Sequence, residues 1–300
     1  MAELGLALGG GGARGLAHIG VLKVLEKEKI DIHAITGCSM GAVIGSLYTY
    51  YGSAEKVEDL MLDFIDKVDL EELGIPNNEE QKDASFWDEF VSEMKFRFQV
   101  VRSLQDLSLI SEEHATKIFE LIPDVEISSL TPKFSAIATD LLSGNEINIR
   151  NGNLRSAVKA SSAIPGIFPP VRRDGMYFVD GSASESVPAG KVRELGADRV
   201  LAVDVSHELK TEEEPKNVLE ILYRTEDISS YHLSMERLKE ADLVISPDVH
   251  GYTWAEFKKA KTIIAEGENA AKENLSEIQR LMERYTITLE LEQLLKKFKS

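Results

Sequence analysis

The sequence is poor in the residues on which several classes of protein depend. One cysteine, Cys38, stands among 300 residues, which excludes an internal disulfide and any metal site built from cysteines. No run reaches the roughly 18 to 20 consecutive apolar residues that a membrane-spanning helix needs, and the first residues lack a basic segment followed by an apolar one. We therefore expect a protein that is neither exported nor membrane-spanning and that works in the cytoplasm.

Positive charge is the second shortage. Lysine and arginine number 34 against 51 aspartates and glutamates, which gives a net charge of −17. Such a surface repels the phosphates of nucleic acids and of anionic lipids, so we expect no nucleic-acid partner. Any contact with a membrane interface should be transient and apolar. The acidic excess is concentrated at residues 53–93, where fourteen acidic residues accompany three lysines.

The residues that are present favour a globular α/β domain. Hydrophobic residues make up 43% of the chain and charged residues 28%. An apolar run at residues 4–8 ends in four glycines and precedes apolar residues at helical spacing, and a second run at residues 30–36 precedes small and apolar residues through Tyr50. This alternation predicts a three-layer sandwich with a mostly parallel central sheet, whose sites gather at the carboxyl ends of the strands.

The whole chain, residues 1–300, is predicted to form one domain with two additions. Residues 53–108 change to an acidic amphipathic helix and then an aromatic-rich stretch, which we interpret as an inserted helical cap or lid. Residues 254–300 are mostly charged and helical, a C-terminal extension. A further helix is predicted from Ser111 to Leu121. Further strands are predicted at residues 134–139, 146–149, 177–179, 199–205 and 243–246.

The aromatic residues of the predicted cap suggest a hypothesis about lipid. Trp87 and the alternating stretch at residues 94–98 would contact an acyl chain or a membrane interface, because aromatic content there exceeds that of the rest of the chain. The alternative is ordinary packing of the cap onto the core. The pattern favours the alternative.

The strongest local motif is Gly37-Cys38-Ser39-Met40-Gly41, between a predicted strand and a predicted helix. In a nucleophile elbow the serine occupies a strained turn, so the residues two before and two after it must be small. Glycine stands at both places. The amide N–H groups at the start of the following helix favour negative charge, as on a developing oxyanion. Ser39 is therefore the candidate nucleophile.

A second motif, Gly9 through Gly15, lies at the end of the first predicted strand. Successive glycine N–H groups form a concave nest for an anion, which predicts an oxyanion hole. The glycines are alternatively explained by close packing of strand and helix. A third interpretation is a dinucleotide fingerprint, Gly10-x-Gly12-x-x-Gly15 with Asp31 as the ribose-binding acid, which would indicate a nucleotide-dependent oxidoreductase.

The third motif is Asp180-Gly181, directly after the predicted strand that ends at Val179. A carboxylate at a strand end can face a cleft and accept the proton of Ser39. An ordinary aspartate is a weak base, so burial must raise its affinity for protons if it acts alone. The alternative for an isolated Asp-Gly pair is a plain turn.

Residues 161–170, SSAIPGIFPP, complete a recognisable order of motifs. GGGGARG, GCSMG, SSAIPGIFPP and DG follow one another at intervals that resemble the patatin-like phospholipase family in its bacterial single-domain form. The resemblance runs from about Leu4 to Asp204 and more weakly to the helices near Ala271. The family often has glycine or alanine after Asp-Gly, whereas this chain has Ser182, which is small enough to fit.

The resemblance implies a lipid acyl hydrolase that uses a serine–aspartate dyad without histidine, cofactor or metal. Ser39 would attack the ester carbonyl, Asp180 would be its base, and the N–H groups of Gly10, Gly11 and Gly12 would stabilise the oxyanion. Arg14 would brace the glycine loop or, as the less favoured alternative, attract a lipid phosphate. A non-catalytic regulator on the same fold stays open. The remaining motif residues are Gly15, Gly37, Gly41 and Gly181.

Histidine provides the main alternative mechanism, a Ser-His-Asp triad. His207 and His250 follow Asp180 near predicted strand ends, although neither has a flanking motif. His18 lies in the first predicted helix beside the glycine loop, where we expect a packing or hydrogen-bonding role. The S-x-x-K match that begins at Ser156 lacks the companion motifs of β-lactamases and is interpreted as a helix face.

Overall fold

The computed structural model describes residues 3–67, 107–108, 110–206, 208–209, 214–215 and 218–283. Most of the predicted cap therefore lies outside the described residues, and so do Trp87, the stretch at residues 94–98 and the end of the predicted C-terminal extension. The division into cap, core and extension stays a prediction.

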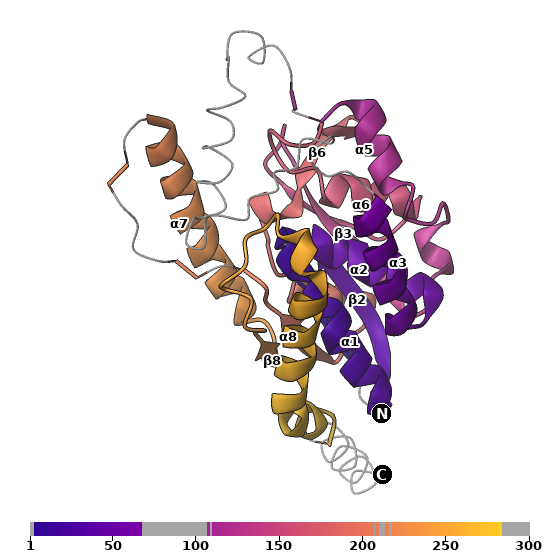
Figure 1. Cartoon of the computed structure of the whole chain (residues 1–300). Helices are drawn as coiled ribbons and strands as arrows, with labels where there is room; N and C mark the ends of the chain where they lie inside the picture. The colour runs from indigo at the N-terminus through magenta and orange to yellow at the C-terminus, as the bar shows by residue number, and fades with distance from the viewer. Residues whose placement is uncertain are drawn as a thin grey trace, which may run out of the picture.

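In the described residues one sheet of eight strands forms the centre of the fold (Figure 1). Its order is β5-β6-β3-β2-β1-β7-β8, with β4 also paired to β3. The pairs among β3, β2, β1, β7 and β8 are parallel, whereas β4, β5 and β6 join by antiparallel pairs. The strands are β1 (Leu4–Leu8), β2 (Ile32–Cys38), β3 (Lys133–Asp140), β4 (Glu146–Ile149), β5 (Val171–Arg173), β6 (Met176–Asp180), β7 (Arg199–Val203) and β8 (Leu243–Ile245).

Helices cover both faces of the sheet. Strand β1 is therefore buried on both of its faces. Leu4, Leu6 and Leu8 belong to the larger core, beneath helices α1 (Ala17–Lys27), α2 (Met40–Tyr51), α3 (Ala54–Lys67) and α8 (Ala260–Glu273). Ala7 faces a smaller core formed with the 3₁₀ helix η5 (Lys191–Leu195) and the end of α7 (Val218–Leu238). The predicted three-layer sandwich with a mostly parallel sheet is confirmed.

Helix α8 lies along α1 on the larger core, as Figure 1 shows. Two glycines permit this close contact: a Cβ on Gly20 would overlap the carbonyl oxygen of Ile264, and a Cβ on Gly267 would overlap that of Ala17. The first predicted part of the cap, α3, also belongs to this layer, since its Ala54, Val57 and Met61 are buried in the larger core.

The other predicted elements differ from the structure mainly in their bounds. The helix predicted from Ser111 is α5 (Glu112–Phe119), and the Ser111 hydroxyl caps it by accepting a hydrogen bond from the His114 N–H at 3.2 Å. Helix α6 (Leu154–Ser161) contains the S-x-x-K match, as expected of a helix face. Strand β5 and helix α7 were not predicted.

Strand β3 is the element that positions the site. Its Ile137 pairs with Cys38 of β2 and with Asn148 of β4, so β2 and β4 lie on opposite edges of β3. The next residue, Ala138, pairs with Ile147 of β4 and with Asp180 of β6. Strand β6 therefore continues on the edge that β2 leaves. The ends of β2 and β6 meet at neighbouring positions of one strand.

Candidate functional site: a serine and an aspartate beside a glycine loop

Ser39 occupies the turn between β2 and α2 in a strained conformation. Its φ of 51° and ψ of −122° lie in a region that side-chain-bearing residues rarely adopt. A Cβ on Gly37 would overlap the carbonyl oxygen of Gly41, and a Cβ on Gly41 would overlap that of Leu8. The predicted nucleophile elbow is present, and both flanking glycines are required by close backbone contact.

Neighbouring groups hold the elbow in place, and Ser39 lines a pocket. The Ser39 N–H donates a hydrogen bond to the hydroxyl of Ser161, the buried last residue of α6, at 3.1 Å. The Ser39 residue is 7% exposed and stands at the N-terminus of α2, whose amide groups favour negative charge. Ser161 opens the SSAIPGIFPP motif, but its hydrogen bond was not predicted.

Asp180 lies where β6 ends, next to the elbow. Its residue exposure is 1%, and its Oδ1 atom accepts hydrogen bonds from the Ser182 N–H at 2.8 Å and the Ser182 hydroxyl at 2.7 Å. The Cys38 thiol is a weaker donor to the same oxygen at 3.7 Å. The other oxygen, Oδ2, has no hydrogen-bond partner of good geometry among the described residues. Ser182 is thus a hydrogen-bond donor to the carboxylate as well as a small residue.

Burial raises the pKa of Asp180 above its ordinary value. Hydrogen bonds from the Ser182 N–H, the Ser182 hydroxyl, Ser39 and Cys38 act in the opposite direction, because they stabilise the ionised carboxylate. The net direction is upward. Asp180 therefore has more affinity for a proton than an exposed aspartate, as the sequence-based prediction requires of a lone base.

The three glycines of the loop beside Ser39 differ in how their N–H groups are bonded. The Gly10 N–H donates to the carbonyl oxygen of Ser186 at 2.9 Å, so it is engaged within the fold. The N–H groups of Gly11 and Gly12 have no partner among the described residues, and all three glycines line the same pocket as Ser39. Among the described residues the N–H groups without a partner are therefore those of Gly11 and Gly12, whereas that of Gly10 fastens the loop.

Two contacts hold the loop in shape. Gly12 has a φ of +56°, which favours glycine, and the N–H of the next residue, Ala13, donates to the Trp254 carbonyl oxygen at 2.6 Å. The buried Arg14 side chain donates from Nε to the Gly11 carbonyl oxygen at 3.4 Å. This hydrogen bond supports the favoured prediction that Arg14 braces the loop.

The other two motif glycines stand at close contacts. A Cβ on Gly15 would lie 2.5 Å from Cγ of Met40, and a Cβ on Gly181 would overlap the Ile137 carbonyl oxygen. Gly15 thus lets the glycine loop contact the elbow. Gly181 lets the turn after the base pack on β3.

Two pockets meet at Ser39. One is polar and contains Asp180, and helix α7 forms one of its walls. The other is apolar and lies between α3, α5 and the segment around Trp254. Gly12, Ser39 and Ile164 line both pockets. The α7 residues of the polar pocket are Glu226, Asp227, Ser230, Tyr231 and Ser234. The apolar pocket includes Met61, Phe64, Ile118, Phe119, Phe168 and Phe257.

Histidine contributes to neither pocket among the described residues. His250 instead lies 3.9 Å from the carboxylate of Glu208, and His207 is outside the described residues. His18 is fully buried and bonds the Gly9 carbonyl oxygen through Nε2 at 2.7 Å, which confirms the expected role. Burial lowers the pKa of His18 to about 4, so its ring is neutral and Nε2–H is the donor.

The dinucleotide interpretation fails on geometry. Strands β1 and β2 are parallel, with Leu4 opposite Ile32 and Leu8 opposite Gly37. Asp31 precedes β2 and so lies at the amino-terminal ends of these strands, whereas the glycine loop lies at their carboxyl ends. Asp31 therefore cannot reach a ribose bound at the loop.

In the described residues no three His, Cys, Asp or Glu side chains are grouped to hold a metal ion, and no described helix is long and apolar enough to cross a bilayer.

Comparisons with known proteins agree with the motifs. The sequence model of the patatin-like phospholipase family matches residues 6–192. An NTE family protein of Mycobacterium tuberculosis is 32% identical over 211 residues, which cover 68% of this chain and 49% of that protein. The lysophospholipase nte1 of Emericella nidulans is 29% identical over 210 residues, which cover 67% of this chain and 12% of that protein. The chain spans about half the length of the mycobacterial relatives it matches.

Two solved structures are similar to the chain at low sequence identity. VipD from Legionella pneumophila has a TM-score of 0.46 and 15% identity over 92% of this chain and 67% of that chain. ExoU of Pseudomonas aeruginosa has a TM-score of 0.42 and 14% identity over 92% of this chain and 53% of that chain.

Proposed function

Because the chain belongs to the patatin-like phospholipase family, we propose that it is a serine acyl hydrolase that cleaves acyl esters of lipids. Ser39 is the nucleophile and Asp180 its base. The observation that carries the proposal is the meeting of β2 and β6 on one edge of β3, which brings both side chains to one pocket. Two glycine N–H groups beside it have no partner in the part of the chain that the structure describes. The lysophospholipase name of a relative supports the same reaction class.

In the first half of the reaction the Ser39 oxygen attacks the ester carbonyl carbon while its proton passes to the Asp180 carboxylate. Oδ2 of Asp180, for which the described residues provide no other donor of good geometry, is the acceptor of this proton. The carbonyl oxygen becomes an oxyanion, which the N–H groups of Gly11 and Gly12 stabilise together with the N-terminus of α2. The tetrahedral intermediate then expels the alcohol, which takes the proton from Asp180, and leaves an acyl-serine.

In the second half a water molecule attacks the acyl-serine and gives a proton to Asp180. The same N–H groups stabilise the second oxyanion, and its collapse releases the fatty acid. The proton returns from Asp180 to Ser39, which restores the enzyme. A single carboxylate thus acts as base in the attack and as acid in the departure of each alcohol.

The two pockets orient the substrate. The apolar pocket suits the acyl chain, since it is lined by aliphatic and aromatic side chains from α3 and α5. The polar pocket suits the alcohol part of the ester, since serines and carboxylates of α7 line it. Ser39 lies at the junction, which is where the ester bond of a lipid joins its apolar and polar parts.

A fluorophosphonate probe tests the proposal. Such a probe forms a covalent adduct with an activated serine, and mass spectrometry should find the adduct on Ser39. Ser39→Ala should abolish the adduct and the release of fatty acid from a lysophospholipid. Ser229→Ala is the matched control, because Ser229 is an exposed serine of α7 that lines neither pocket, and this variant should leave labelling unchanged.

The alternative functions give different results. A non-catalytic regulator would fold normally but leave Ser39 unlabelled and every ester intact. An oxidoreductase would bind a dinucleotide, which equilibrium dialysis would detect. An adduct on another serine, or labelling that survives Ser39→Ala, would contradict the proposed nucleophile.

A further inference from the structure

A second buried acid, Glu185, lies five positions after the base and has no assigned role. The residue is 1% exposed, and neither oxygen of its carboxyl group meets a hydrogen-bond donor among the described residues. Its polar neighbour is the carboxyl group of Glu146, which is placed for a side-chain hydrogen bond. Two carboxylates cannot bond each other, because both only accept. A proton on one of them supplies the missing donor.

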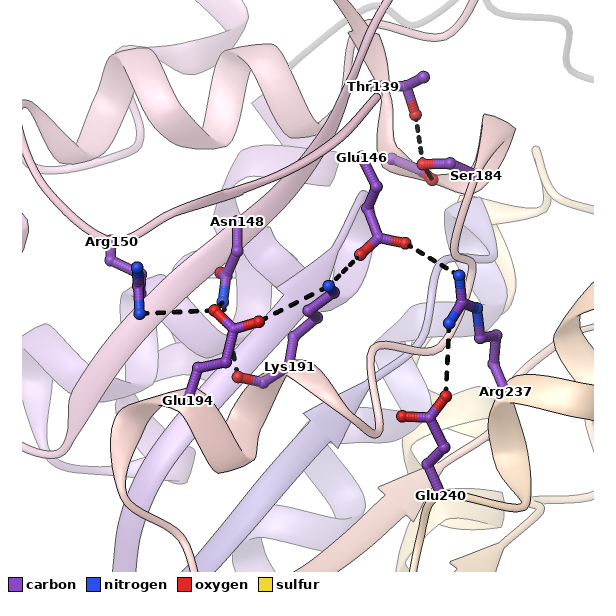
Figure 2. Close-up of polar contacts among 10 residues, drawn as sticks. Thr139, Glu146, Asn148, Arg150, Ser184, Lys191, Glu194, Arg237 and Glu240 are labelled. Carbon is purple, nitrogen blue, oxygen red and sulfur yellow. Dashed lines mark hydrogen bonds and ion pairs between the residues drawn. The ribbon is translucent and has the colours of Figure 1, made fainter. Parts of the chain in front are cut away.

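The surroundings decide which carboxyl group carries the proton. Glu146 is held by cations: Lys191 Nζ lies 2.7 Å from its Oε1, and Arg237 of α7 lies 3.7 Å from its Oε2. Figure 2 shows Glu146 between these two side chains. Burial, then the hydrogen bond and the charge of Glu146, raise the pKa of Glu185 to about 9. Glu146 is therefore the carboxylate and Glu185 the neutral acid.

Strand β4 explains how Glu146 reaches this position. Its Ile147 and Ile149 pack into the larger core, so Glu146 and Asn148 point to the opposite face of the sheet. There they meet η5 and the end of α7. The Arg237 side chain also lies 3.4 Å from Glu240, and Asn148 bonds Glu194 at 3.2 Å. Figure 2 shows these contacts as one polar network across β4, η5 and α7.

The backbone of Glu185 belongs to a short segment that begins with the proposed base and bonds the glycine loop at its other end. Residue 180 is the base, and the carbonyl oxygen of Ser186 accepts the Gly10 N–H at 2.9 Å. Between them, the Glu185 N–H donates to the Gly181 carbonyl oxygen at 2.8 Å, and the Ser184 hydroxyl bonds that of Thr139 at 2.7 Å. The position of this segment sets the distance between the base and the oxyanion loop.

We infer that Glu185 is a positioning residue: as a neutral acid bonded to Glu146, it anchors the segment of residues 180–186 and so holds the base and the glycine loop in register. Arg237 joins α7, a wall of the polar pocket, to the same anchor. The inference rests on the proposed function, because it assigns a role in aligning that site.

Ionisation of Glu185 should therefore loosen the site. A second negative charge would face the Glu146 carboxylate in a buried position, and Coulomb repulsion would separate the two groups. The charged and titratable groups that face this pair are Lys191 from η5, Arg237 from α7 and Cys38 at the end of β2. Activity should consequently fall in the alkaline range.

The experiment is the pH profile of fluorophosphonate labelling at Ser39, measured on wild type and Glu185→Gln. Wild type should show a rate constant that rises as Asp180 ionises and falls near pH 9, where Glu185 ionises. Glutamine keeps the shape, stays neutral and donates to Glu146 through its amide, so this variant should keep the rise and lose the fall. A fall that persists in Glu185→Gln would overturn the inference.

Two further variants separate positioning from general support of the fold. Glu146→Gln removes the charge that raises the pKa of Glu185, so the alkaline fall should move to lower pH. Glu240→Gln is the matched control, since Glu240 also pairs with Arg237 but is exposed, and its profile should equal that of wild type. A uniform loss of rate in Glu185→Gln with an unchanged profile shape would indicate a structural role only.

Melting temperatures of wild type and Glu185→Gln test the protonation without any activity. A raised pKa in the folded state means that the stability contributed by Glu185 is complete below its ordinary pKa of 4.5 and is lost as pH rises toward about 9. The advantage of Glu185→Gln over wild type should therefore widen across that range. A wild type that never labels would contradict the proposed function, whereas parallel melting curves would contradict the anchor.

Discussion

Asp180 and Glu185 are two carboxyl groups of one segment, equally buried, with opposite roles. Each residue is 1% exposed, and burial raises the pKa of both. They differ in what surrounds them. Asp180 accepts two hydrogen bonds from Ser182 and a weaker one from Cys38, whereas Glu185 meets no donor among the described residues and faces a carboxylate.

The difference teaches that donors, not depth, decide the protonation state. Hydrogen bonds to an ionised carboxylate offset part of the cost of burying it, so the donors around Asp180 oppose the rise in its pKa that burial causes. Without donors the same burial leaves Glu185 neutral, and a neutral acid can serve as a hydrogen-bond donor. The fold thus places the proposed base and the proposed neutral acid within six residues.

Removing the base should have the largest effect. Asp180→Asn preserves the shape of the side chain but cannot take the Ser39 proton, so kcat for a p-nitrophenyl ester should fall by about 10²- to 10⁴-fold. Steady-state kinetics checks the loss, and circular dichroism checks that the variant folds. A folded Asp180→Asn enzyme with wild-type kcat would assign the base to another residue.

If Asp180→Asn kept the wild-type kcat, histidine would be the next candidate for the base. His250→Ala is the control for the triad alternative, and because His250 lines neither pocket we expect unchanged kinetics. His207→Ala completes the test for the histidine outside the described residues.

Weakening the donor set of Asp180 should shift its titration. Ser182→Ala removes the hydroxyl donor at 2.7 Å and keeps the N–H donor at 2.8 Å. Since a hydrogen bond to the ionised form lowers the pKa, its loss should move the rising limb of the kcat profile to higher pH by up to about one unit. The plateau above that limb should remain. A limb that moves to lower pH would contradict the role given to Ser182.

The hydrogen bond between Thr139 and Ser184 also holds the segment of residues 180–186, and its loss should have a smaller effect on activity. Thr139→Val removes the hydroxyl that bonds Ser184 at 2.7 Å without changing the size of the side chain. We expect a loss of about 1 kcal/mol in the free energy of unfolding, measured by urea denaturation. The alkaline limb of activity should stay in place, because Glu185 keeps its proton. A displaced limb would assign the anchor to the hydroxyl pair instead of the acid pair.

The smallest shift is expected at Cys38. Its thiol lies 3.7 Å from Asp180 Oδ1, farther than either Ser182 donor, and thiols are weak donors. Cys38→Ala should therefore move the acid limb by less than Ser182→Ala does. Cys38→Ser offers a stronger donor in the same place and should move the limb the other way. Equal shifts for the two alanine variants would show that donor strength does not set the pKa of Asp180.

Much of the fold and of the site was predictable because the residues involved stand in recognisable local sequence patterns. The elbow around Ser39 is a pentapeptide between a strand and a helix, and Asp180 follows a strand end. Their meeting depends on β6 running antiparallel to β3, which the sequence pattern did not predict. Strand β5 was missed because three residues are too few to show a period of two.

The missed parts of the site depend on partners far away in the chain. The role of Gly10 is set by the carbonyl oxygen of Ser186, and a carbonyl group has no side-chain signature. Helix α7 was missed because its pocket side is polar and its apolar residues follow no single stripe. Glu185 was indistinguishable from a surface glutamate until Glu146 was placed beside it. Ser182 was judged by its size, although its hydroxyl was the useful signal.

The shared edge of β3 also determines when catalytic power arises during synthesis. Ser39 is translated early and Asp180 much later, and each reaches its place only by pairing with β3, which is translated between them. A nascent chain that has emerged through β3 displays a strained serine but no base. An unfinished polypeptide should therefore lack esterase activity, and recovery of that activity on refolding should coincide with completion of the sheet.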